Sequence, residues 1–558
     1  MRYNLRYFIA AGLIGIILVA SSCAKKLDDA YANPNANVRQ PIEVIFPSLI
    51  GSLTGSSSAA GSAYGLCGDA LLIGRYIQYW GSYIVNNGVN LGTQYDKMGG
   101  VSAPSDNLGS MWGSYYYGMG QNITRIIEWG TEEEKWDFVG AAWALRAWGM
   151  LETANEYGDM IQKEAFNTSL QVFKYDEQSE VYDSVRATCH RAIEFLSRSG
   201  GGMNPTSFAA SDAYFNTGNL ERWKKFTYGI LARSFAYIHN KPSYNADSVI
   251  TYADLSITTN ADNATAKFAS TGITGTSNYY GTFRGNVNNT STGIRQSAFI
   301  ANLMTGANAG AFTGVSDPRV LYMLRENTNG TVKGITPWLA ASGLVAADQP
   351  QNFMGTSFGT VGYPGNETTN RYIFRNGAEF PIMTASEILF IKAEAALRKG
   401  LFPVAMTAYT TAISLNFDML STKYNINIPA GKEITPVNKA AYLADVNIVP
   451  TDPTKLTLTR IMLQKYIALY AWGVQSTWAD MRRYHYNVDI DPGTTQPVYV
   501  GFSPPTGSDL FIDNAGKVVQ RCRPRYNSEY LYNIPELTRI GAVLPNYHTK
   551  EQWFSIKP

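Results

Sequence analysis

The chain has 558 residues and a nearly even charge balance, with 46 basic and 44 acidic side chains and a formal net charge of +2. This length is ample for a large buried core. The even balance and the absence of a basic run argue against a nucleic-acid partner. Charged residues make up only 16% of the chain, whereas tyrosine (36 residues) and tryptophan (11) are abundant. Because these side chains combine an apolar face with a polar tip, the composition suits a surface that meets neutral or amphipathic ligands.

The N-terminus has the pattern of an export signal. Two arginines precede an apolar run over residues 8–20, and small residues then lead to Cys23. The run holds about 13 residues against the ~20 of a membrane-spanning helix, so we expect it to be removed. The small residues before the cysteine resemble a bacterial lipobox, in which the thiol takes a diacylglycerol. We predict a lipoprotein signal peptide at residues 1–22 and lipidation at Cys23; an ordinary signal peptide with an incidental cysteine is the alternative.

The rest of the chain is interpreted as a short tether and one domain. Residues 23–47 are polar and rich in proline and asparagine, as expected of a lipid-anchored tether, and residues 48–558 form the single domain. That domain contains Cys67, Cys189 and Cys522. An odd number of widely separated cysteines allows at most one disulfide, so the stability of the domain has to come from its core.

Helical patterns dominate this domain. The acidic run at residues 131–134 suits the first turn of a long helix, because acidic side chains favour the positive end of the helix dipole. That helix continues to about Tyr157, and Gly158 can end it. Residues 457–483 are interpreted as one long helix with an apolar face at three- and four-residue spacings. Further helices are expected at residues 177–197, 219–239, 246–257, 386–399 and 403–415.

Several of these helices share a spacing of small and aromatic residues. In the last pair the spacing is formed by Ala405, Tyr409 and Ala412, and it recurs at residues 185–193 and 246–253. Small side chains at such positions let two antiparallel helices approach closely, as in tetratricopeptide repeats. We therefore predict a mostly α protein built on a tetratricopeptide-like scaffold of helix pairs.

Two stretches interrupt the helical pattern, at about residues 259–380 and 486–530. Both are rich in glycine, asparagine, threonine and serine, and aromatic residues are scattered through the first. Connections this long are usually either functional or disordered, and the interleaved aromatic residues favour an ordered one. We predict that the irregular insert at residues 259–380 belongs to a long, loop-rich, ligand-binding side of the molecule.

The chain offers no credible catalytic or metal site. The segment Gly355–Gly359 matches the Gly-x-Ser-x-Gly nucleophile elbow, but no strand leads into it and no helix follows. Paired carboxylates for glycoside cleavage come from distant positions, so spacing does not mark them out. We expect no enzyme and no metal or cofactor, with a structural calcium ion in the loop Asp489–Asp491 kept as an alternative. The histidines lack any paired metal-ligand spacing; they are His190, His239, His485 and His548.

Aromatic clusters are the strongest sign of a binding surface. The three consecutive tyrosines at residues 115–117 cannot all face one core, so at least one should meet solvent or ligand. Sugars stack their apolar C–H faces on aromatic rings, and peptides can use the same surface. Burial is the alternative, above all for the first cluster, whose spacing suits a buried helix stripe. The clusters are Tyr76, Tyr79, Trp80 and Tyr83; Trp112 with residues 115–117; and Tyr279, Tyr280, Phe283 and Arg284.

Four segments resemble one known family. Glu379–Leu397 and Gln464–Arg483 both look like the segment that enters the last tetratricopeptide unit of SusD/RagB-type outer-membrane lipoproteins. Arg523–Tyr530 is similar to the C-terminal signature of that family, and Tyr31–Asn35 to its N-terminal one. The chain thus resembles the SusD-like nutrient-binding lipoproteins of Bacteroidetes.

The resemblance implies a non-catalytic, lipid-anchored protein on the cell surface of the outer membrane. It would cover a SusC-like TonB-dependent transporter, capture an oligosaccharide or a peptide, and deliver it. Glycan and peptide both stay open as ligands, and a surface glycoside hydrolase or peptidase, or a structural or adhesive lipoprotein, remain the alternatives. Family ligand sites lie in loops after the first helices and in the central insert, which makes seven residues the candidates for ligand contact: Trp80, Tyr83, Trp112, Tyr115, Tyr279, Tyr280 and Arg284.

Overall fold

The computed structural model describes residues 39–55, 64–82, 96–100, 108–270, 276–281, 294–339, 343–355 and 367–558. The predicted signal peptide, Cys23 and most of the predicted tether lie outside these residues. Among the helices within them, none is both long enough and apolar enough to span a membrane.

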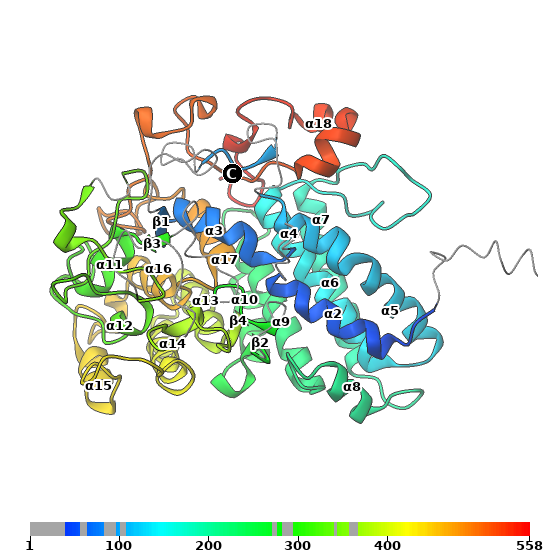
Figure 1. Cartoon of the computed structure of the whole chain (residues 1–558), viewed down its shortest axis with the longest axis horizontal. Coiled ribbons are helices and arrows are strands. Elements are labelled where there is room, and N and C mark those ends of the chain that lie inside the picture. Colours follow the sequence, from blue (N-terminus) through cyan, green and yellow to red (C-terminus); the bar gives the residue numbers. More distant parts are fainter. Residues whose placement is uncertain are drawn as a thin grey trace, which may run out of the picture.

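Helices make up most of the fold, and strands are few and short (Figure 1). The helices of the first half are α2 (Ile42–Thr54), α3 (Leu66–Tyr76), α4 (Ser110–Gly113), α5 (Gln121–Glu132), α6 (Trp136–Tyr157), α7 (Gln178–Leu196), α8 (Pro205–Ser211), α9 (Leu220–Ala236) and α10 (Ala246–Leu255). Those of the second half are α11 (Ala298–Thr305), α12 (Val320–Met323), α13 (Ala385–Arg398), α14 (Phe402–Lys423), α15 (Pro436–Ala444), α16 (Leu458–Ala468), α17 (Val474–Arg483) and α18 (Ile534–Ile540). Two π-helices are also present, η4 (Ser114–Gly120) and η13 (Tyr526–Tyr530).

Successive helices pack in pairs, which confirms the predicted helix-pair scaffold. α6 packs against α7, α9 against α10, and α13 against α14. Small residues allow the close approach in the last pair, where Ala393, Ala405 and Ala412 are fully buried. Helix α10 then packs on α13, and α13 on α16, so that neighbouring pairs share a continuous core.

The structure corrects the prediction that the acidic run at residues 131–134 begins a long helix. The run does not begin a helix: Thr131 and Glu132 end α5, and Glu133 and Glu134 lie in the turn before α6 begins at Trp136. Glu134 adopts the left-handed conformation (φ +55°) that breaks the helix. The end of α6 agrees with the prediction, because Gly158 takes φ +86°, which other residues rarely adopt.

The predicted long helix at residues 457–483 is also corrected, because it is divided into α16 and α17. Ala471 takes a left-handed conformation (φ +71°) at the division. Residues 469–472, between the two helices, are all buried. All residues of α17, and all residues of α16 except Arg460, are buried, so the rest of the chain covers nearly every side of both helices.

Two small antiparallel sheets join segments that are far apart in the sequence. Strand β1 (Trp80–Ser82) pairs with β3 (Ile294–Gln296), and β2 (Ala264–Ala266) pairs with β4 (Phe380–Met383). Three of these strands lie in or at the edge of the predicted irregular insert. Its described part also contains the short helices α11 and α12, so the insert is tied to the helical scaffold at several points.

A buried arginine links three helices of the scaffold. The guanidinium of Arg233 in α9 donates to Glu152 in α6 (Nη1–Oε1 2.9 Å) and to Glu387 in α13 (Nη2–Oε2 2.7 Å). The three side chains expose 5% or less of their surface. Burial raises the pKa of Glu152 to about 7 even though Arg233 opposes this shift. The Arg233 cation therefore offsets part of the cost of burying these two acidic side chains.

Candidate functional site

The structure describes five of the seven predicted ligand-contact residues and places all five in the core. Each exposes 5% or less of its surface; they are Trp80, Trp112, Tyr115, Tyr279 and Tyr280. Tyr83 and Arg284 lie outside the described residues. Ligand contact by the seven stays a prediction. In this conformation, however, the five described side chains are covered by protein, so a ligand would reach their ring faces only after a rearrangement.

Trp80 shows why the first aromatic cluster is buried. Its indole packs edge-on against the ring of Tyr280, with 6.1 Å between centroids. A Cβ atom at Gly74 would lie 2.4 Å from the indole, so α3 can cover Trp80 only because position 74 is glycine. Tyr76 and Tyr79 are fully buried as well. The described members of this cluster are buried, as the alternative in the sequence analysis held, but they do not form one helix stripe, because α3 ends at Tyr76 and Trp80 lies in β1.

The second aromatic cluster opens onto a groove of about 420 Å³. Tyr115 is buried, Tyr116 is half-buried and Tyr117 is 53% exposed, which confirms that at least one of three consecutive tyrosines meets solvent. The groove lies at the end of the molecule where α18 and the loop between α6 and α7 come together (Figure 1). Its aromatic lining residues are Trp112, Tyr116, Tyr117, Phe166, Phe173 and Tyr532.

The exposed aromatic faces of this groove belong to tyrosines and not to the tryptophan. The indole of Trp112 is packed against Tyr116 (4.8 Å between centroids), Tyr157 (5.1 Å) and Tyr175 (5.8 Å). Tyr532, by contrast, is 71% exposed, and Tyr117 is 53% exposed although the Arg525 guanidinium lies 5.3 Å from its ring centroid. These two tyrosines are the surfaces on which a flat apolar ligand face could stack.

Both π-helices among the described residues line this groove. η4 contributes Tyr116 and Tyr117, and η13 contributes Ser528 and Glu529. A π-helix is rare because its wide turn packs and bonds less well than an α-helix, and it is found frequently at functional sites. Two such segments, about 400 residues apart in sequence, meet at one groove, which marks it as the leading candidate site.

A buried carboxylate fixes the entry to η4. Asp69 in α3 accepts hydrogen bonds from the backbone N–H groups of Gly109 (3.0 Å), Ser110 (2.9 Å) and Met111 (2.8 Å). It also accepts one from the hydroxyl of Tyr157 in α6 (3.0 Å). Four donors satisfy one buried carboxylate, and α4 is thereby held against α3 and α6. The helical scaffold thus positions the tyrosines of the groove.

Two polar side chains of the groove are buried. Glu529 accepts hydrogen bonds from the Tyr175 hydroxyl (2.8 Å) and from Nδ2 of Asn533 (3.1 Å). Burial raises the pKa of its carboxyl group. The same Asn533 nitrogen donates to the carbonyl oxygen of Phe173 (3.0 Å), whereas Oδ1 of Asn533 has no partner among the described protein groups. A buried acceptor without a donor is costly, and a ligand could satisfy it.

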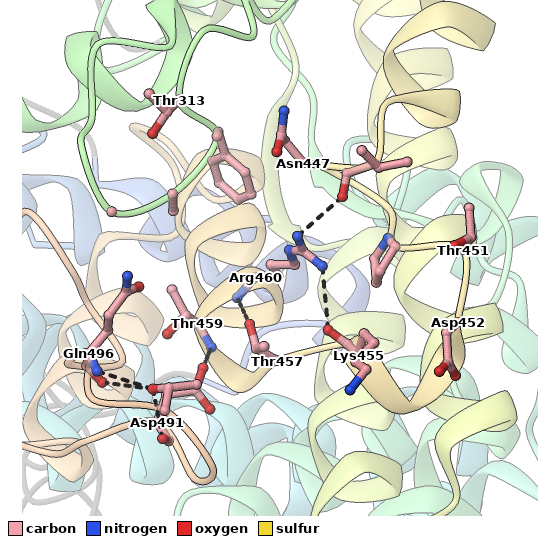
Figure 2. Close-up of a pocket in the computed structure, with 16 residues that line it drawn as sticks. Thr313, Asn447, Thr451, Asp452, Lys455, Thr457, Thr459, Arg460, Asp491 and Gln496 are labelled. Atoms are coloured by element: carbon pink, nitrogen blue, oxygen red, sulfur yellow. Dashed lines mark hydrogen bonds between the residues drawn. The ribbon is translucent and has the colours of Figure 1, made fainter.

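A second cavity of about 420 Å³ lies near the start of α16, and Figure 2 shows that key charged groups in it already bind protein. Asp491 accepts two backbone N–H groups at the start of α16 (3.2 and 2.8 Å). Arg460 donates to the carbonyl oxygens of Val446 (3.1 Å) and Lys455 (3.4 Å). These contacts hold the surrounding segments together. The aromatic groove is the better candidate for a ligand site.

Comparison with known proteins identifies the family. The sequence model of the SusD-like family, described as starch-binding and associating with the outer membrane, matches residues 72–495. The chain belongs to the SusD-like family. No curated protein sequence matches it.

Solved structures agree with this membership at the level of the fold. A SusD/RagB family protein from Bacteroides thetaiotaomicron is 19% identical, covers 93% of this chain and 100% of its own, and gives a TM-score of 0.63. A SusD homologue from Bacteroides fragilis is 18% identical (92% and 100% covered, TM-score 0.64). A chitin-binding SusD homologue from Flavobacterium johnsoniae is 17% identical (93% and 99% covered, TM-score 0.63). The predicted fold class is confirmed.

The loop Asp489–Asp491 of this SusD-like chain does not support the calcium alternative. Asp489 binds His485 (3.0 Å) and Lys557 (2.8 Å), and Asp491 caps α16. His485 also contacts Glu551 (2.9 Å), and these carboxylates raise its pKa to about 9. Within the described part of the chain, no group of three or more histidine, cysteine or acidic residues is placed to hold a metal ion.

Most residues of the groove were not predicted from the sequence. Tyr117 carried a signal, because it belongs to the run of three tyrosines, and Tyr532 lies close to the segment that resembles the C-terminal family signature. No sequence pattern singled out Phe173 or Asn533, which are 360 residues apart and meet through a hydrogen bond. Only the folded chain brings them together.

Proposed function

We propose that this SusD-like protein is a cell-surface lipoprotein that captures oligosaccharides, without cleaving them, and delivers them to a SusC-like TonB-dependent transporter. The observation that carries the proposal is the aromatic groove, found in a chain of a family described as starch-binding and associating with the outer membrane. The family description favours a glycan over the peptide that the sequence left open.

The chemistry of the groove supports glycan capture. Pyranose rings present apolar C–H faces, which stack on aromatic side chains such as Tyr117 and Tyr532. The groove also offers amides for sugar hydroxyls, at Gln121, Asn167 and Gln171. A relative with the same fold, from Flavobacterium johnsoniae, is chitin-binding, so a glycan site is compatible with this scaffold.

Binding and product analysis on the same samples test the capture step. A soluble form that lacks residues 1–23, called the mature chain below, is titrated with a panel of oligosaccharides by calorimetry, and each mixture is then analysed by mass spectrometry. We expect saturable binding and no shortened products. Turnover of any oligosaccharide would refute the proposal in favour of a surface glycoside hydrolase.

Membrane anchoring and transporter delivery need a test in cells. The full-length chain, with an affinity tag at its C-terminus, is purified from outer membranes in mild detergent. We expect a TonB-dependent β-barrel to co-purify in near-stoichiometric amount. Recovery of the lipoprotein alone, under conditions that preserve other outer-membrane complexes, would contradict delivery through such a partner.

A further inference from the structure

We infer that the aromatic groove selects uncharged sugars, in which a ligand hydroxyl or amide N–H donates to Oδ1 of Asn533 while apolar sugar faces lie on Tyr117 and Tyr532. This inference rests on the proposed glycan capture. It adds the place of binding, a specificity-determining residue and the charge class of the ligand.

The orientation of the Asn533 amide decides what it can recognise. Its Nδ2 donates to the carbonyl oxygen of Phe173 (3.0 Å), which can only accept, and also to the carboxyl group of Glu529 (3.1 Å). The amide oxygen therefore faces away from both partners. Asn533 is 4% exposed, lines the groove, and its Oδ1 has no partner among the described protein groups. Protein covers Oδ1 in this conformation, so a ligand donor reaches it once the covering side chains rearrange, and that donor would then satisfy it.

Ser528 adds a hydroxyl to the same groove. It is buried beside the Glu529 carboxyl group, with which it interacts, so it helps to hold Glu529 in place. The groove thus combines exposed aromatic side chains with one unsatisfied buried polar atom, Oδ1 of Asn533, which a purely structural cavity would not retain without cost.

The charges around the groove favour an uncharged ligand. Its lining contains no lysine, arginine or histidine, and its acidic residue, Glu529, is buried. Two arginines beside the groove are engaged with its aromatic rings: Arg525 lies 5.3 Å from the Tyr117 centroid and Arg146 lies 4.8 Å from that of Phe166. A carboxylated or sulfated sugar would lose its hydration here without gaining a lining cation.

The test uses a glycan panel and two exposed tyrosines. The panel contains neutral oligosaccharides, their uronic acid counterparts and sulfated oligosaccharides, titrated against the mature chain. We expect the tightest binder to be neutral, and expect Tyr117→Ala and Tyr532→Ala each to weaken its binding by roughly tenfold. Tyr214→Ala is the matched control, because Tyr214 is 50% exposed and does not line the groove; its binding should equal that of the wild type.

A ligand series then tests the contact with Asn533. Deoxy analogues of the tightest binder, each lacking one hydroxyl, are titrated against the wild type and Asn533→Ala. We expect one analogue to bind the wild type roughly tenfold more weakly than the parent sugar does. Asn533→Ala should bind that analogue and the parent sugar with the same affinity. A thermal melt of Asn533→Ala shows whether the variant folds; if it does not, Asn533→Ser replaces it.

The outcomes separate this inference from the proposed function. If both tyrosine variants bind the neutral oligosaccharide as tightly as the wild type does, the groove is not the binding site. That result would leave the proposed glycan capture intact. Tighter binding of an anionic sugar would overturn the charge class; Arg460 and Lys455 would then direct attention to the cavity of Figure 2. Absence of binding across the whole panel would overturn both.

Discussion

Replacement of Arg233 by methionine should destabilise the scaffold strongly and in a pH-dependent way. Methionine keeps much of the side-chain volume but removes the cation that links α9 to Glu152 and Glu387. Removing one partner of a buried ion pair costs about 3–5 kcal/mol, because the other charge remains buried. Against a free energy of unfolding of about 5–15 kcal/mol, such a loss is a large fraction.

The pH dependence follows from the two carboxylates left behind. Burial raises the pKa of Glu152 and Arg233 lowers it, so without Arg233 the pKa of Glu152 should rise further above its unfolded value. When the pKa of a carboxyl group is higher in the folded protein than in the unfolded chain, the folded protein loses stability as the pH rises from the unfolded pKa, 4.5, to the folded pKa. The deficit of Arg233→Met relative to the wild type should therefore be smallest near pH 5 and largest at pH 8.

Urea unfolding of the mature chain, followed by circular dichroism at pH 5 and pH 8, measures this deficit. The control is Arg198→Met, since the Arg198 side chain is 40% exposed and pairs with a more exposed glutamate, so less than about 1 kcal/mol should be lost. Adding Glu152→Gln and Glu387→Gln to Arg233→Met should abolish the pH dependence. A deficit below about 1 kcal/mol at both pH values would refute the reasoning.

Three further predictions concern single positions. Gly74→Ala should lower the free energy of unfolding by about 1–3 kcal/mol, because the added Cβ would lie 2.4 Å from the indole of Trp80. Urea unfolding measures this loss, and an unchanged midpoint would contradict the close packing of α3 on Trp80. Protonated His485, with its pKa raised to about 9, stabilises the fold fully below pH 6.5 and progressively less through pH 9. The stability gap between the wild type and His485→Asn should therefore shrink from pH 6 to pH 10, and a constant gap would speak against the ion pairs. Cys23→Ser should release the chain from membranes into the soluble fraction, as fractionation and immunoblotting would show; retention in the membrane would argue against lipidation.

The groove depends on the scaffold that carries it. Asp69 ties the start of α4 to α3 and α6, and the Tyr116 hydroxyl donates to the carbonyl oxygen of Ile161 (2.5 Å) in the loop after α6. The C-terminal segment forms another side of the groove, and there Asn533 binds the loop between α6 and α7. Changes in the helix pairs should therefore alter ligand binding even when they lie outside the groove.

Local patterns in the sequence were enough to determine the helical character of this protein and its family. Helix pairing depends on small and aromatic residues three and four positions apart, such as Ala405, Tyr409 and Ala412, and such spacings can be seen in a short window. The export pattern that ends at Cys23 is equally local. The family resemblance, now confirmed, also rests on continuous segments such as Glu379–Leu397.

Only the tertiary structure decided which aromatic side chains are open and where the groove lies. Tyr115 and Tyr117 are two positions apart and have the same chemistry, yet one is buried and the other is 53% exposed. Burial is set by packing against distant segments, and hydrogen bonds such as that from Asn533 to Phe173 join positions 360 residues apart. A spacing rule covers a few residues of one helix, so it does not determine which side of that helix the rest of the chain will cover.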